Sequence, residues 1–162
     1  MNDVPQTQPD VTQPFLVPSG EDRAGYAKVL GISSVAFKVT SQDSQALFAA
    51  EVTLVQKGGP AKHVHFDQDE HFYVFEGEFI LEVGDKRLHL KPGDSAFGPR
   101  GIPHAWAFSQ GTIGRMLFVV SPVGQLEAFF IDAAKTETLP GPNQNQWRPY
   151  GMEWVGPPVS LD

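Results

Sequence analysis

Between Ile32 and Val120 the chain alternates short apolar runs, rich in Val, Phe, Thr and Ile, with turns rich in Gly, Pro, Asp and Ser. This spacing is typical of strands and tight turns, so it predicts an all-β domain. The predicted strands are residues 34–40, 47–56, 62–66, 71–75, 79–83, 86–90, 95–98, 105–108 and 115–120. The glycines at 77 and 84 can adopt the positive φ of tight hairpins, so we expect consecutive strands to pair antiparallel.

The two ends of the chain follow other patterns. Residues 1–22 are rich in Gln, Pro, Asp and Thr without alternation, and we expect a flexible arm there. Apolar residues at i, i+3, i+4 and i+7 from Leu126 predict a short helix opened by Ser121-Pro122, which completes a domain of residues 23–135. Residues 136–162 hold five prolines and several aromatic residues, so we expect an irregular tail that packs on the barrel.

Composition narrows the classes of function. The chain has 162 residues, enough for one domain, and a net charge of −7 without a basic cluster, which argues against a nucleic-acid partner. Its apolar runs are far shorter than the roughly 20 residues of a membrane helix, and residues 1–22 do not resemble a signal peptide, so we expect no membrane association and a cytoplasmic location. Because the chain has no cysteine, only histidines and carboxylates are available to hold a transition metal.

The segment GGPAKHVHFDQDEHFYVFEG, residues 58–77, carries the first chemical pattern. His63 and His65 lie two residues apart, so on a strand their imidazoles point to the same face. A tight polar turn over residues 66–69 can bring Glu70 back beside them. We expect Gly77 to end the following strand in a hairpin. The other two strand histidines, His71 and His89, are interpreted as surface or packing residues.

The second pattern is GDSAFGPRGIPH, residues 93–104, in which prolines and a glycine fix a turn just before His104. Three imidazoles and one carboxylate suit Fe, Mn, Ni, Cu or Zn as a divalent ion, and a six-coordinate ion would keep two open positions. The hypothesis is therefore one such metal per chain, held by His63, His65, Glu70 and His104. A rival set, His65, Asp67 and His104, fits a two-histidine, one-carboxylate triad but leaves His63 and Glu70 unexplained.

Together these residues closely resemble the two signature motifs of the cupin superfamily. The positions that carry the resemblance are Gly58, His63, His65, Glu70, Gly77, Gly93, Pro99, Gly101 and His104. The resemblance implies an antiparallel double-stranded β-helix, or jelly-roll barrel, and a homodimer. The first glycine lies one residue nearer His63 than is usual, and Phe108 stands where the motif usually has Asn. The wider layout, with a helix and a GPP-bearing tail after the barrel, is similar to the small single-domain, quercetin-dioxygenase-like branch.

The predicted cavity and metal site lead to the hypotheses about function. By alternation, Phe72, Trp106 and Phe108 share the face of the metal ligands, so they are candidate substrate-binding residues of an aromatic wall, or else ordinary core. The leading hypothesis is a dioxygenase for a small aromatic or enolic substrate such as a flavonol. The resemblance implies that Glu70 is also its catalytic base. The alternatives are a metal-assisted small-molecule binder or sensor, and a metal-dependent isomerase or hydrolase.

Overall fold

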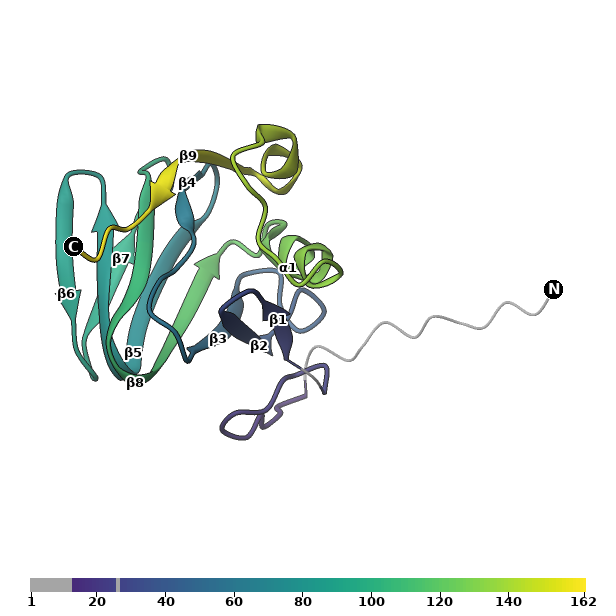
Figure 1. Ribbon diagram of the computed structural model, residues 1–162. Coiled ribbons are helices and arrows are strands. Elements are labelled where there is room, and N and C mark those ends of the chain that lie inside the picture. Colours follow the sequence, from purple (N-terminus) through teal and green to yellow (C-terminus); the bar gives the residue numbers. More distant parts are fainter. Residues whose placement is uncertain (1–12, 26) are drawn as a thin grey trace.

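The structure is a computed structural model that describes residues 13–25 and 27–162 (Figure 1). Most of the predicted arm, residues 1–12, lies outside the described residues, and within residues 13–22 Asp22 is buried. The strands are β1 (Lys28–Leu30), β2 (Ser33–Val39), β3 (Phe48–Leu54), β4 (Ala61–His65), β5 (Asp69–Val83), β6 (Lys86–Leu90), β7 (Ser95–Gly98), β8 (His104–Ser121) and β9 (Met152–Pro158). Helix α1 (Leu126–Ala134) and two short 3-10 turns, η1 (Gln144–Gln146) and η2 (Arg148–Tyr150), complete the described part.

Two long strands, β5 and β8, form the backbone of the barrel. They pair antiparallel along nearly their whole length, from Asp69 opposite Ser121 to Val83 opposite His104. The second half of β8 also pairs with β3, which continues through β2 to β1, whereas its first residue pairs with β4. On the other side, β5 pairs with β7 through its first half and with β6 through its second half. The result is the curled antiparallel sheet that the sequence predicted, and Figure 1 shows it curving around a common interior.

The predicted hairpin at Gly77 is wrong, because β5 continues through this residue. The β5–β8 register shifts between Val74 and Phe79, and Gly77 has φ +74° in this irregular stretch. A Cβ on Gly77 would lie 2.6 Å from the Ile113 carbonyl oxygen and 2.7 Å from the Phe108 ring. The two predicted strands on either side are therefore one strand with a bend, as bulges and glycines produce in closed sheets. For the same reason, predicted strands 105–108 and 115–120 merge into β8.

This bend yields a stability prediction. Gly77→Ala should lower the free energy of unfolding by about 2 to 4 kcal/mol, because the methyl group meets the strand opposite and the backbone is left-handed. Gly151→Ala is the matched control, since Gly151 has the same φ of +74° but no atom within 4 Å of the position that a Cβ would take. The control should lower the free energy of unfolding, measured with urea, by about 1 kcal/mol. Equal losses in the two variants would contradict a packing role for Gly77.

Helix α1 closes one end of the barrel, and the spacing from Leu126 predicted it correctly. Leu126, Phe129 and Ala133 are buried, and Phe130 packs against the same core. The helix begins at Leu126, four residues after the proline expected to open it. It contacts β1, a three-residue strand that the pattern missed, and η2.

The tail is more regular than the sequence predicted. Residues 152–158 form strand β9, which pairs antiparallel with β4 beside the histidines (Figure 1, yellow). The expectation that prolines exclude regular structure was wrong here because β9 pairs only with β4. Pro157 and Pro158 end the strand at the edge of the sheet, where a missing N–H breaks no ladder hydrogen bond. Within residues 13–25 and 27–162, no helix is long and apolar enough to cross a membrane.

Candidate metal centre

Three strands bring the four predicted ligands together. His63 and His65 project from one face of β4, Glu70 lies near the start of β5, and His104 begins β8 directly opposite His63. All four side chains are buried, and one potential ligand atom from each lies within 4.8 Å of the others. The polar turn between β4 and β5 is what returns Glu70 to the histidine pair, as the spacing predicted.

The carboxylate of Glu70 lies between two imidazoles. His104 Nε2 is 2.8 Å from Glu70 Oε2, and His65 Nε2 is 3.4 Å from the same oxygen. The rings of His65 and His104 are parallel, with centroids 5.3 Å apart, and the His63 ring stands 4.6 Å from that of His104. The Nε2 edges of His65 and His104 therefore converge on one carboxylate oxygen.

The opposite edge of each ring faces an oxygen acceptor. His63 Nδ1 is 2.7 Å from the Ala61 carbonyl, and His104 Nδ1 is 3.4 Å from the Ile102 carbonyl. His65 Nδ1 is 3.1 Å from the side-chain oxygen of Gln68. With a metal bound at Nε2, each ring would carry its N–H at Nδ1 and donate it to the oxygen behind, which is the usual arrangement around ligand histidines.

Gln68 is the residue of this site that the sequence analysis missed. Its side-chain NH₂ donates to the carbonyls of Pro122 (3.1 Å) and Val123 (2.9 Å), so its oxygen is the atom that faces His65. A Cβ on Gly124 would lie 2.5 Å from this NH₂ group, so the amide occupies space that only glycine leaves open. Gln68 follows two exposed residues in the turn between β4 and β5, and nothing in its sequence position indicates that it points inward.

Burial and hydrogen bonding set the charges at the cluster. Burial lowers the pKa of His63 to about 3, helped by the neighbouring His104 and His65, so this ring is neutral at physiological pH. Burial raises the pKa of Glu70, but hydrogen bonds from His104 and His65 outweigh it and the pKa lies below its usual range. A neutral imidazole and an ionised carboxylate are the forms that coordinate metals.

The chemistry of this cluster fits a divalent transition metal. Three imidazole nitrogens and one carboxylate suit Fe, Mn, Ni, Cu or Zn, and the oxygens behind the rings orient them as ligands. Asp67 of the rival set is exposed and is not a member of the cluster, so that triad is not assembled. His71 and His89 are exposed, as expected from their place on the strands.

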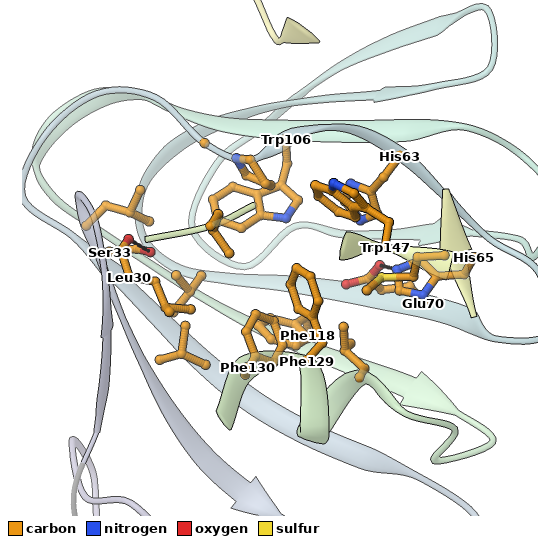
Figure 2. A pocket seen from close by; sticks show the side chains of 18 of the residues that line it. Leu30, Ser33, His63, His65, Glu70, Trp106, Phe118, Phe129, Phe130 and Trp147 are labelled. Atoms are coloured by element: carbon orange, nitrogen blue, oxygen red, sulfur yellow. Dashed lines mark hydrogen bonds and ion pairs between the residues drawn. The ribbon is translucent and has the colours of Figure 1, made fainter. Parts of the chain in front are cut away.

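A cavity of about 70 Å³ opens beside the cluster (Figure 2). His63, His65 and Glu70 line one part of it, and most of the remaining wall is apolar, including Phe118, Phe129 and Phe130. Figure 2 shows Phe118, Phe129 and Phe130 on the side of this space opposite Trp106.

Of the three predicted substrate-binding residues, Trp106 lines the cavity. Phe72 and Phe108 are completely buried and are not among the lining residues. The Phe72 ring packs 5.9 Å from that of His104, behind the ligand. Phe108 fills the bend between β5 and β8, against Gly77 and Gly114. Alternation along the strands placed all three inside the barrel but could not show which of them reaches the cavity.

The tail supplies part of the cavity wall, a role that its aromatic residues suggested. The indole of Trp147 is 1% exposed, and its ring lies 5.5 Å from that of His63 and 5.3 Å from that of Phe129. Its N–H donates to the Gly141 carbonyl at 2.9 Å. The segment after α1 therefore covers the end of the cavity at which His63 lies.

Comparison with known proteins agrees with this fold. Residues 50–120 match the family model described as Cupin domain, a segment that contains all four candidate ligands. An RmlC-like cupin from Shewanella frigidimarina is 26% identical, with a TM-score of 0.52 over 68% of this chain and 94% of that one. The match over residues 50–120 and the fold support the cupin superfamily.

More distant structures share the fold alone. The polyketide cyclase RemF from Streptomyces resistomycificus is 21% identical, with a TM-score of 0.56 over 67% of this chain and 80% of that one. The nucleoside dehydratase Pac13 from Streptomyces is 11% identical, with a TM-score of 0.61 over 92% of this chain and 96% of that one. No curated protein matched the chain in this comparison.

Proposed function

We propose that this cupin is a metal-dependent enzyme that activates a small enolic compound, with oxidation by dioxygen as its chemistry. The observation that carries the proposal is a buried carboxylate at the junction of a metal-ligand cluster and an apolar cavity. A carboxylate that binds a purely structural metal ion needs no such cavity beside it. A bound ion would supply Lewis acidity and, if redox-active, electron exchange with oxygen.

Glu70 is the proposed base. Its Oε2 lies near His104 and His65, whereas its Oε1 has no hydrogen bond within the described residues. Every side-chain oxygen or nitrogen that is shut off from solvent there has a partner, so Oε1 opens onto the cavity. A carboxylate oxygen in this position can accept the proton of an enol hydroxyl, and the apolar walls keep competing water away.

The size of the cavity favours the small end of the predicted substrate range. At about 70 Å³ it is roughly half the volume of an apolar cavity that holds benzene. A three-ring flavonol exceeds this space several-fold, whereas acetylacetone, with one heavy atom more than benzene, exceeds it by roughly two-fold and needs only a limited shift of the lining side chains. We therefore propose a small β-diketone or related enol as the substrate class.

A second candidate is proton-transfer chemistry without oxygen. His63 Nε2 also lacks a hydrogen-bond partner in the described residues and belongs to a cavity-lining side chain. When no ion occupies Nε2 of His63, an ionised carboxylate and a neutral imidazole on one cavity suffice for isomerisation or dehydration. This candidate requires no dioxygen, and oxygen uptake separates it from the first.

The test uses protein purified without chelator or nickel resin and reconstituted separately with Fe, Mn, Ni, Cu and Zn. Acetylacetone should cause oxygen uptake with at least one redox-active metal. Glu70→Gln should lower kcat by about 10² to 10⁴ after correction for metal content, whereas Glu76→Gln, at an exposed position of β5, should not. Product without oxygen uptake would support the second candidate. A thermal shift without turnover would indicate a binder or sensor.

A further inference from the structure

The three tryptophans of the chain differ in what their indole N–H groups contact. Trp147 N–H donates to the Gly141 carbonyl. Trp154 lies on strand β9 and is half-buried near the surface. Trp106 is 8% exposed and lines the cavity, yet its N–H has no hydrogen bond within residues 13–25 and 27–162.

The Trp106 N–H faces the cavity. No side-chain nitrogen or oxygen cut off from solvent lacks a partner in the described part of the chain, so this unpaired donor must reach open space. The indole itself lines the cavity wall, and Figure 2 shows its nitrogen on the side turned toward His63 and Trp147. A buried donor without a protein partner is unfavourable unless water or a ligand accepts its hydrogen bond.

The donor complements the other polar groups of the cavity. In the metal-free protein Glu70 Oε1 and His63 Nε2 offer lone pairs, whereas Trp106 offers a proton. The surrounding wall is mainly aliphatic and aromatic. Such a site fits a ligand with an apolar body and at least one oxygen that accepts from Trp106. An anionic ligand is disfavoured, because the wall is mainly apolar and the ionised Glu70 carboxylate on the same cavity would repel it.

We propose that Trp106 is a specificity-determining residue whose N–H binds the carbonyl oxygen of a small neutral oxo compound in this cavity. The inference rests on the proposed function for its substrate class, a β-diketone or related enol, but the interaction itself requires neither metal nor oxygen. The ligand's apolar body occupies the space beside Phe118, Phe129 and Phe130. Trp147 contributes only the apolar surface of its ring, because its N–H already donates to the Gly141 carbonyl.

The experiment follows the three indole N–H signals by ¹H–¹⁵N NMR in the full chain, in the metal-free form and in the zinc form. The probes are acetone and isobutene. The two molecules have the same shape, but isobutene has a CH₂ group in place of the carbonyl oxygen of acetone. Acetone should move the Trp106 indole proton downfield in a saturable way, and isobutene should not. Trp106→Phe and Trp147→Phe assign the signals.

The two variants also separate hydrogen bonding from loss of ring surface. Trp106→Phe should weaken acetone binding roughly five-fold relative to Trp147→Phe, about the effect of one hydrogen bond. Equal weakening in both, an unmoved Trp106 signal up to about 100 mM acetone, or identical shifts with isobutene would overturn the inference. Acetone binding through Trp106 without oxygen uptake from acetylacetone would refute only the oxidation chemistry. Oxygen uptake with an unmoved Trp106 signal would refute only the role of Trp106.

Discussion

Replacing His104 with alanine should weaken metal binding by more than about 100-fold. The imidazole stands in the middle of the cluster, with its Nε2 2.8 Å from Glu70 and its ring near those of His63 and His65. Changes to residues behind a metal ligand already cost roughly 10- to 100-fold in affinity, and loss of the ligand itself costs more. His65→Ala should behave in the same way. Metal content after dialysis against Zn and a competitive chelator titration measure the effect.

The control for this prediction is His89→Ala, because His89 is exposed on β6, away from the cluster. It should bind metal as the unaltered protein does. His104→Ala also leaves the buried Glu70 carboxylate without its shortest hydrogen bond, so the metal-free variant should lose about 1 to 3 kcal/mol of stability. Circular dichroism at the titration temperature verifies that the variant is folded. Folded His104→Ala and His65→Ala proteins that bind metal normally would disprove the site.

The second large effect is expected at Gln68, which does not belong to the ligand set. Gln68→Met keeps the length of the side chain but removes the oxygen that accepts from His65 Nδ1. Without this acceptor, His65 is free to rotate or to carry its proton on Nε2, where it blocks coordination. We expect metal affinity to fall by about 10- to 100-fold. Gln110→Met, at an exposed position of β8, is the control and should have no effect.

Two further variants distinguish orientation of His65 from simple packing. Gln68→Glu keeps an acceptor for His65 but places an anion against the carbonyls of Pro122 and Val123, so it should lose more stability than Gln68→Met while retaining more metal affinity. Gly124→Ala keeps Gln68 itself but adds a methyl group that displaces the Gln68 amide from its position beside His65. It should therefore weaken metal binding, as Gln68→Met does. ¹⁵N NMR of the imidazoles reports the tautomer of His65 directly. If metal affinity falls in proportion to the free energy of unfolding across all these variants, Gln68 acts by packing alone and does not orient His65.

Local patterns in the sequence determined the fold class and the identity of the candidate ligands. Alternation with period two identified most of the strands, and the spacing from Leu126 identified α1. His63 and His65 share a face because a strand alternates its side chains, whatever lies around it. The tight turn before Glu70 and the proline-rich turn before His104 are likewise short-range features, so the four ligands were accessible to reasoning from sequence.

Only the tertiary structure decided which residues surround that cluster. Gln68 reaches His65 through hydrogen bonds to carbonyls more than fifty residues away, and Trp147 covers His63 from a tail in which prolines obscured the strand β9. Phe72 and Phe108 have the same alternation as Trp106, yet one packs behind His104 and the other fills the bend at Gly77. Periodicity specifies the face on which a side chain lies. The space in front of that face is set by strands and loops distant in sequence, whose positions depend on the packing of the whole barrel.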